Sequence, residues 1–196
     1  MRLFLTTDRL ALRRFTEADE DNLIELNSDP EVMRFLNGGN PTPRDEVRTR
    51  IIPTFLGYYE QFEGFGFWAA VETATSQFLG WFHFRPPLRD RDTPVGWDED
   101  GVIELGYRLR RSAWGKGYAT EGSHALVDKG FAEFGVRRVV AETLAGNQAS
   151  RRVLEKSGLI QVDAFASTEP DSANKSAEQV HVAYELTRAS WEARAL

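Results

Sequence analysis

The 196-residue sequence contains no cysteine and only three histidines. The absence of cysteine excludes disulfide bonds, cysteine-ligated metal sites and a mechanism that passes through an acyl-cysteine intermediate. The histidines are His83, His124 and His181, and no two of them have the four-residue spacing of a helical metal-ligand pair. We therefore expect no metal site in this protein.

Long apolar runs are also missing. No segment approaches the ~20 consecutive apolar residues that span a bilayer, and the apolar part of Met1–Thr7 is too short for a signal peptide. The net charge of −6 argues against nucleic acid as a partner and agrees with a cationic one. We expect a cytoplasmic protein without a membrane or nucleic-acid partner, and either a monomer or a homodimer.

The composition and periodicity predict one α/β (α+β) domain that covers residues 1–196. Its 41% hydrophobic and 28% charged residues are typical of a globular domain of this length. Alternating apolar residues predict about seven strands, near 9–13, 65–72, 78–84, 102–109, 138–144, 159–165 and 179–186. Helical spacing and capping residues predict helices near 16–27, 30–36, 42–61, 119–134 and 147–157, with a helical tail at 187–196. Aromatic residues on both faces of the second and third strands predict helices on both faces of the sheet.

The segment from Val102 to Gly122 organises the rest of the chain. A strand at 102–109 leads into a glycine-bearing turn, and the turn opens directly into a helix. The first N–H groups of such a helix are unpaired, and glycines let an anion approach them closely. This order predicts a phosphate or pyrophosphate site, although a turn whose glycines serve only packing has the same pattern. It matches neither a P-loop nor a dinucleotide-binding fingerprint.

Three motifs in and after this segment resemble those of the GNAT acyltransferases, and more narrowly the RimJ/RimL-like branch. They are E-L-G-Y at 104–107, W-G-K-G-Y-A-T-E at 114–121 and N-Q-A-S-R-R-V-L-E-K-S-G at 147–158. The resemblance extends from Thr7 to about Arg188. It implies the GNAT fold, a central mixed and mostly antiparallel twisted sheet flanked by helices on both faces. It also implies direct transfer of an acetyl group from acetyl-CoA to a primary amine.

The resemblance also assigns cofactor-binding residues. In the family, the backbone of the glycine turn holds the pyrophosphate of acetyl-CoA, here at Gly115, Lys116, Gly117, Tyr118, Ala119 and Thr120. A bulge that we expect at Gly106-Tyr107 would separate this strand from the next, so that Leu105 and Tyr107 face the cofactor. Asn147 is a helix N-cap and, by resemblance, a cofactor contact as well.

Two residues are candidates for the chemistry. Glu104 lies on the polar face of the central strand, where Gly106 leaves that face open, and we predict that it accepts the amine proton; a cross-strand salt bridge with an arginine is the alternative. Many GNAT enzymes place a tyrosine acid where this chain has Leu154, and the RimL-like branch offers Ser150 instead for the departing thiolate. We expect His83 to be a hydrogen-bonded core residue.

The acceptor is the least determined part of the function. An α-amine is neutral about once in seven molecules at pH 7 and a lysine amine about once in 2500, so an α-amine needs roughly 3.5 kcal/mol less from the base. This favours a protein or peptide N-terminus. A small-molecule amine of the antibiotic or polyamine type and a non-catalytic acyl-CoA-binding module are the alternatives. The acidic run Asp98–Asp100 is a candidate lip for a cationic acceptor.

Overall fold

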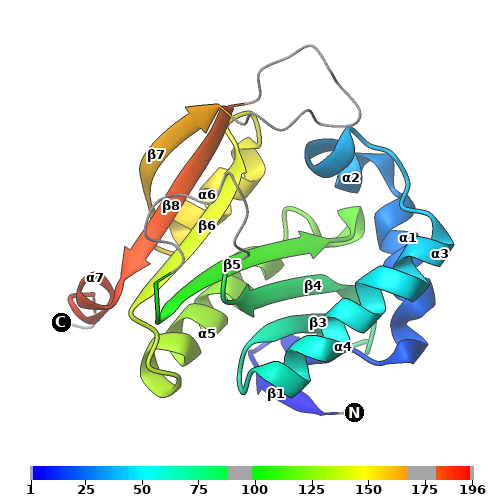
Figure 1. Ribbon diagram of the computed structural model, residues 1–196, viewed down its shortest axis with the longest axis horizontal. Helices are drawn as coiled ribbons and strands as arrows, with labels where there is room; N and C mark the ends of the chain where they lie inside the picture. The colour runs from blue at the N-terminus through cyan, green and yellow to red at the C-terminus, as the bar shows by residue number, and fades with distance from the viewer. Residues whose placement is uncertain (1, 88–98, 167–179, 195–196) are drawn as a thin grey trace.

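The computed structural model describes residues 2–87, 99–166 and 180–194 (Figure 1). Their strands form one eight-stranded sheet in the order β1-β2-β3-β4-β5-β6-β8-β7. The strands are β1 (Leu3–Thr6), β2 (Leu10–Arg14), β3 (Gly66–Glu72), β4 (Phe78–Arg85), β5 (Val102–Leu109), β6 (Arg138–Leu144), β7 (Ile160–Ala166) and β8 (Val180–Thr187). Neighbouring strands are antiparallel except for β5 and β6, which run parallel. The predicted mixed, mostly antiparallel sheet is therefore confirmed.

Strand β1 is the one strand that the sequence did not predict, and it raises the number from about seven to eight. Only four residues long, it pairs with β2 at the edge of the sheet. The ring of Phe4 stacks on that of Trp68 in β3, with ring centroids 3.7 Å apart. The stack of Phe4 on Trp68 joins residues more than sixty positions apart. Local periodicity does not reveal such a contact, which helps to hold β1 in place.

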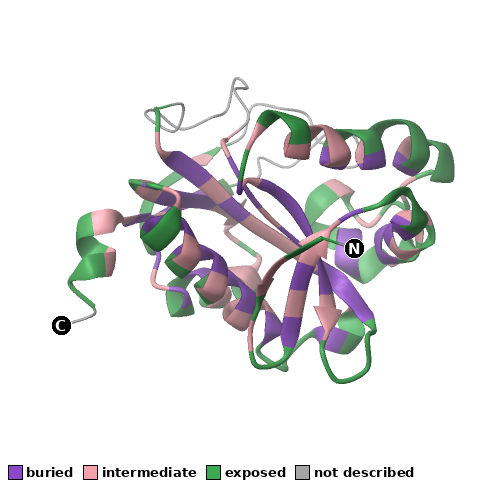
Figure 2. Cartoon of the chain, turned by 90° about the horizontal axis from the view of Figure 1, so that it is seen from below, coloured by how far each residue is buried: buried purple, intermediate pink, exposed green. Residues whose placement is uncertain are grey.

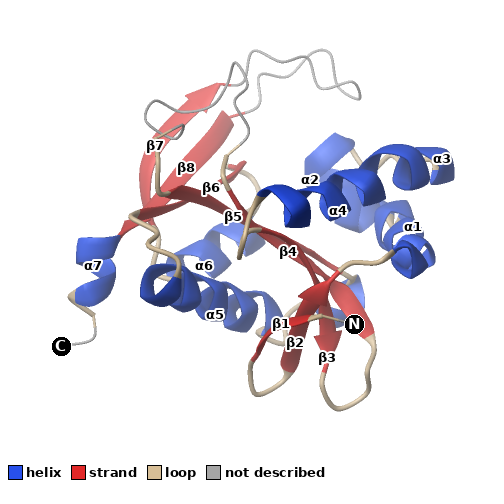
Figure 3. Ribbon diagram, turned by 60° about the horizontal axis from the view of Figure 1, so that its bottom comes forward, coloured by secondary structure: helices blue, strands red, loops and turns tan. Residues whose placement is uncertain are grey.

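Helices cover both faces of the sheet, as predicted (Figure 3). They are α1 (Glu20–Ser28), α2 (Pro30–Asn37), α3 (Arg44–Glu46), α4 (Ile52–Gln61), α5 (Tyr118–Glu133), α6 (Gln148–Lys156) and α7 (Arg188–Glu192). The C-terminal helix α7 is anchored by Trp191, whose ring stacks on Phe131 with centroids 5.2 Å apart. None of the helices in the described segments has both the length and the hydropathy needed to cross a bilayer.

The helix predicted at 42–61 is interrupted close to the expected kink. A π-helical turn at Val47–Ile51 separates α3 from α4, and Pro53 lies in the first turn of α4. Proline lacks the N–H group that would continue an α-helical ladder, and its ring crowds the preceding turn. The wider π-helical turn before Pro53 accommodates both effects.

The alternation of side chains along β3, β4 and β5 divides the core into two layers. On the first face, Trp68, Phe82 and Leu105 pack with residues of α5 and α6. On the second face, Phe67 and Trp81 pack with residues of α1 and α4. Figure 2 shows buried strands between helices whose outer surfaces are exposed. Each strand therefore presents alternate residues to two different environments.

Strands β5 and β6 separate toward their carboxyl ends, as Figure 1 shows. Their parallel ladder contains three residue pairs and ends at Glu104 and Val140, although β5 continues to Leu109 and β6 to Leu144. The predicted bulge at Gly106-Tyr107 is wrong, because β5 pairs with β4 without interruption through both residues. The strands diverge because the parallel ladder stops, and β5 itself stays regular.

Candidate active site

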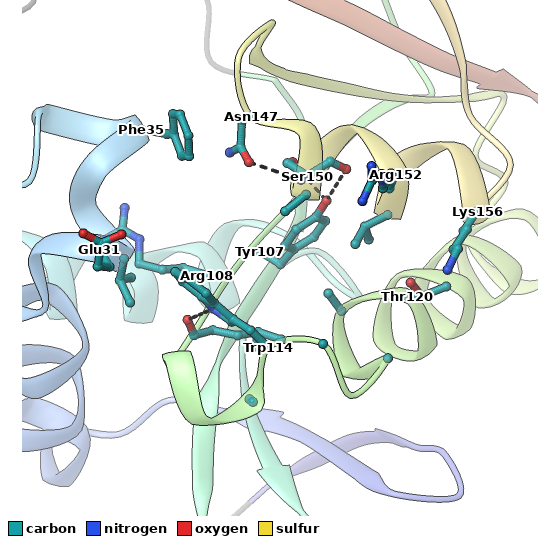
Figure 4. A pocket seen from close by; sticks show the side chains of 18 of the residues that line it. Glu31, Phe35, Tyr107, Arg108, Trp114, Thr120, Asn147, Ser150, Arg152 and Lys156 are labelled. Atoms are coloured by element: carbon teal, nitrogen blue, oxygen red, sulfur yellow. Dashed lines mark hydrogen bonds between the residues drawn. The ribbon is translucent and has the colours of Figure 1, made fainter.

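A cavity of about 410 Å³ lies where β5 and β6 have separated. Its walls come from the carboxyl end of β5, the glycine turn with the start of α5, one side of α6 along its whole length, and one side of α2 (Figure 4). Seven of the predicted site residues line this cavity: Tyr107, Gly115, Gly117, Ala119, Thr120, Asn147 and Ser150. Segments that are distant in the sequence thus converge on one space.

The glycine turn has the geometry that the sequence predicted. Gly115 and Gly117 adopt left-handed backbone conformations, with φ of 71° and 84°, and Gly117 is the N-cap of α5. A residue with a Cβ atom is strained in this region, so glycine is the favoured residue at both positions. The unpaired N–H groups of the first turn of α5 and the helix dipole together favour a bound anion.

Two predicted residues of the turn direct their side chains away from the cavity. Tyr118 is buried, and its hydroxyl group donates a hydrogen bond to Glu72. The side chain of Lys116 is not part of the cavity wall, and its carbonyl oxygen accepts a 2.9 Å hydrogen bond from Arg9. What these residues offer to an anion is therefore their backbone.

An ion pair between Glu121 in the first turn of α5 and Arg9 in the β1–β2 turn holds the glycine turn in place. The carboxylate of Glu121 accepts hydrogen bonds from the Thr7 hydroxyl at 2.5 Å, the Arg9 amide at 3.0 Å and Arg9 Nε at 2.7 Å. Burial alone would raise the pKa of Glu121, but these donors outweigh it and lower the pKa. The turn between β1 and β2 thereby fixes the first turn of α5. Sequence reasoning missed this clamp because more than 110 residues separate its partners.

The Tyr107 and Ser150 side chains meet across the gap between β5 and α6. The Tyr107 hydroxyl lies 3.0 Å from Ser150 Oγ and also donates to the Ser150 carbonyl oxygen at 3.0 Å. Asn147 Oδ1 accepts the Ser150 backbone N–H at 3.2 Å, which confirms Asn147 as the N-cap of α6. Burial raises the pKa of Tyr107, so its hydroxyl stays protonated and serves as a donor.

Glu104 and Leu105 are not part of the cavity wall. Leu105 is buried in the first core layer. Glu104 Oε2 lies 3.0 Å from Arg85 Nη2, the cross-strand salt bridge that the sequence left open as an alternative, and Oε1 lies 3.5 Å from His83 Nε2. Burial by itself raises the pKa of Glu104, but His83 and Arg85 outweigh it and the pKa lies below its usual value.

The expectation that Gly106 leaves this face of β5 open is wrong. A Cβ atom on Gly106 would lie 2.5 Å from His83 Nε2, so the imidazole ring fills the space that the glycine provides. His83 is a core residue, as predicted, but its Nε2 has no hydrogen-bond partner in the described part of the chain. Burial lowers the pKa of His83, and Glu104 offsets this only in part, so the ring is neutral at pH 7.

Two further expectations concern metal binding and the acidic run. Among the described residues, no group of three or more histidine, aspartate or glutamate side chains is placed to hold a metal ion. Asp98 lies outside the described residues, as does most of the predicted surface loop before it. Glu99 is described and lies 3.7 Å from Arg138. An acidic lip for the acceptor therefore stays a prediction.

Comparison with known proteins links this chain to a family. A family model described as an acetyltransferase (GNAT) domain matches residues 9–160. The chain is 32% identical over 187 residues to the FsC-acetyl coenzyme A-N(2)-transacetylase of Aspergillus fumigatus, covering 95% of this chain and 77% of that protein. It is 34% identical over 156 residues to YkkB of Bacillus subtilis, covering 79% of this chain and 84% of YkkB.

Solved structures with the same fold include two with bound coenzyme A. The ribosomal L7/L12 alpha-N-protein acetyltransferase RimL superposes with a TM-score of 0.76 at 17% identity, covering 96% of this chain and 99% of RimL. The aminoglycoside acetyltransferase AAC(6')-Ib superposes with a TM-score of 0.72 at 22% identity, covering 95% of this chain and 99% of that one. At these identities the likeness shows a shared fold.

The glycine turn generates a direct test of cofactor binding. Gly117→Asp places a carboxylate at the N-terminus of α5, where it occupies the anion site and repels a pyrophosphate. We expect the Kd for coenzyme A, measured by calorimetry, to rise about a hundredfold, since each charge-assisted hydrogen bond is worth ~1.5–3 kcal/mol. Gly135→Asp is the matched control: Gly135 also has a left-handed φ, of 64°, but does not line the cavity. Equal affinity of the two folded variants would contradict the assignment.

Proposed function

Because this chain belongs to the GNAT family of acetyl-CoA-dependent N-acetyltransferases, we propose that its acceptor is an α-amine, as at the N-terminus of a peptide or protein. One observation carries the proposal. A single cavity joins the glycine turn and the Tyr107–Ser150 pair to one side of α2. Cofactor and acceptor therefore have adjoining places along the open edge of β5.

The residues of the first face of β5 are assigned to the cofactor. Acetyl-CoA supplies the acetyl group as a thioester. The backbone N–H groups from Gly115 to Thr120 bind the pyrophosphate, and Asn147 lines the cavity beyond them. The peptide groups of β5 after Glu104 have lost their partners on β6, so they are available to pair with an extended chain. Leu105 contributes its backbone in this way, while its side chain stays in the core.

Ser150 is proposed to stabilise the departing thiolate. In the arrangement in which the Tyr107 hydroxyl donates to Ser150 Oγ, the serine proton is available to the cavity. A thiol has a pKa of about 8.5, so its thiolate requires a hydrogen-bond donor more than a strong acid. The position of the missing tyrosine acid is occupied by Leu154, which is buried in the core. Ser150 and Tyr107 are thus the hydroxyl groups at this end of the cavity.

Glu104 is proposed to accept the amine proton through water, because its side chain does not line the cavity, with His83 beside it. A carboxylate whose pKa is lowered by its partners is a weak base. Such a base suits an acceptor that gives up its proton easily, and an α-amine does so at ~3.5 kcal/mol less cost than a lysine side chain. This match between a weak base and a weakly basic amine supports the α-amine.

A small-molecule amine is the second candidate. The relative from Aspergillus fumigatus is named for transfer to N(2) of FsC. The part of the cavity formed by Val32, Phe35 and Leu36 on α2 is apolar and is closed on one side by the helix. A compact acceptor fits such a wall as well as the end of a peptide does.

An amine panel distinguishes these acceptors. The panel contains short peptides with free N-termini, the same peptides blocked at the N-terminus but carrying a lysine, an aminoglycoside and a polyamine, and release of coenzyme A is followed. We expect turnover of the free N-termini and little turnover of the blocked lysine peptides. Turnover confined to the aminoglycoside or the polyamine would favour the second candidate and contradict the first.

The role of Ser150 is tested by Ser150→Ala. We expect kcat to fall about tenfold to a hundredfold, because the thiolate loses its hydrogen-bond donor. Affinity for coenzyme A should stay close to that of the wild type. Ser157→Ala is the matched control, since Ser157 lies at the end of the same helix, is buried and does not line the cavity. Wild-type kcat in Ser150→Ala would remove Ser150 from the mechanism.

Glu104→Gln separates proton transfer from structure. If Glu104 accepts the proton, kcat should fall by ~10² and part of it should return as the pH rises, because free amine becomes available. The variant should also lose roughly 3 kcal/mol of stability, since it leaves the buried Arg85 without its partner.

The stability difference has its own dependence on pH. His83 and Arg85 together lower the pKa of Glu104 below its usual value of 4.5, so the stabilisation from these contacts is complete above that value and is lost as the pH falls further. The difference in Tm between wild type and Glu104→Gln should therefore shrink below about pH 4.5. A reduced Tm together with an unchanged pH–rate profile would show that Glu104 has only a structural role. His83 or water would then be the group that accepts the amine proton.

A further inference from the structure

Arg108 is a half-buried cation on the second face of β5, one residue after Tyr107. Its Nη1 donates a 2.6 Å hydrogen bond to Asn27 Oδ1 on α1, and its guanidinium group lies 5.0 Å from the centre of the Trp81 ring. Its Nε is buried and has no hydrogen-bond partner in the described residues. The contacts that Arg108 does make are therefore with uncharged groups.

The neighbouring arginines differ from Arg108 in this respect. Arg85 lies 3.0 Å from Glu104, and Arg110 lies 2.8 Å from Glu25. Within residues 2–87, 99–166 and 180–194, no carboxylate forms an ion pair with Arg108. Burial lowers the pKa of Arg108 to about 10, so it still carries its charge at neutral pH. A charge that is partly removed from water and has no counter-ion costs free energy, and a carboxylate that enters the cavity beside it would recover part of that cost.

Arg108 also forms part of the cavity wall. In Figure 4 its side chain extends from β5 toward α2, where Glu31 and Phe35 are labelled. The Tyr107–Ser150 pair lies on the α6 side of the same cavity. Arg108 is thus on the side of the cavity away from α6, where the proposed function places the acceptor.

We propose that Arg108 binds a carboxylate of the acceptor and makes the enzyme selective for amines that carry one nearby. A guanidinium group offers a planar pair of N–H donors that matches a carboxylate. A more highly charged phosphate is disfavoured, because Glu31 belongs to the same cavity wall. The inference rests on the proposed function, since it takes the acceptor to occupy the α2 side of the cavity.

The carboxylate could come from two sources, and matched acceptor pairs distinguish them. Alanine against alaninamide, compared at a pH at which both amines are neutral, tests an α-carboxylate next to the amine. Alanyl-aspartyl amide against alanyl-asparaginyl amide tests an acidic second residue in a peptide. We expect the wild type to prefer the acid member of at least one pair by about tenfold to a hundredfold in kcat/KM, the value of one or two charge-assisted hydrogen bonds.

Three variants connect this preference to Arg108. Arg108→Gln keeps a donor for Asn27 but removes the charge, so the preference for the acid should fall to near unity. Arg108→Lys keeps the charge and should retain part of the preference. Arg110→Gln is the matched control, because Arg110 lies two residues further on, is paired with Glu25 and does not line the cavity. Its preference should equal that of the wild type.

A binding measurement gives a result that does not depend on turnover. The wild-type protein with saturating coenzyme A is titrated by calorimetry with N-acetylalanine, N-acetylalaninamide and the acetylated forms of the two dipeptide amides. We expect the acid member of a pair to bind about tenfold or more tightly than its amide, and Arg108→Gln to abolish the difference. The proposed acceptor class can fail in the turnover assay while this binding difference persists, so the two failures are distinguishable.

Three outcomes would overturn the proposal. The first is equal binding of acid and amide, or no binding of either acid, by the wild type. The second is a preference for acids that survives in Arg108→Gln. The third is a loss of coenzyme A affinity in Arg108→Gln as large as the loss of acid binding, because Arg108 would then bind the cofactor. If Arg108→Gln lowers the Tm but does not change the preference for acid over amide, the role of Arg108 is only structural, through its hydrogen bond to Asn27.

Discussion

The cavity and the residues that line it depend on the point where the β5–β6 ladder ends. The two strands share three residue pairs and then diverge after Glu104 and Val140. The backbone groups of β5 beyond this point need new partners, because unpaired peptide groups inside a protein are costly. In the proposed function the cofactor takes this place. The divergence also opens the space that Tyr107 enters from β5 and Ser150 from α6, so one interruption of the sheet would create both the cofactor path and the cavity.

The elements that depend on local sequence were predicted well. Alternation in 102–109 and the glycines at 115 and 117 are local signals, and the structure has a strand, a left-handed turn and a helix there. Pro53 marked the interruption of a helix to within a few residues. Strand β1 was missed because its stability comes from pairing with β2 and from the stack of Phe4 on Trp68. The pairing with β2 is local, but four residues are too few to show a period, and the stack on Trp68 forms only when β3 has joined the sheet.

In the candidate site, too, local motifs predicted the course of the backbone but not the partners of the side chains. Motifs brought seven of the predicted residues to one cavity, because a strand, a turn and a helix start fix where the backbone goes. Side-chain partners depend instead on register. Arg85 stands opposite Glu104 and His83 opposite Gly106 because of the way β4 pairs with β5, and a register shifted by one residue would exchange the faces. The bulge and the open space at Gly106 were wrong for this reason, and the Arg9–Glu121 clamp was invisible.

The two faces of β5 thereby acquire different chemistry. The first face is apolar apart from the Tyr107 hydroxyl and packs against α5 and α6. The second face carries Glu104 and Arg108 and packs beneath the N-terminal helices. On that face the carboxylate of Glu104 forms an ion pair with Arg85 and lies beside the neutral His83. It is therefore not available to Arg108, whose charge has no ion-pair partner among the described residues. An acceptor that brings its own carboxylate would complete the pairing that the chain leaves open, and water would carry the proton of its amine to Glu104, four residues before Arg108 on the same face of the strand. Recognition and proton transfer would then follow from the two-residue repeat of a single β-strand.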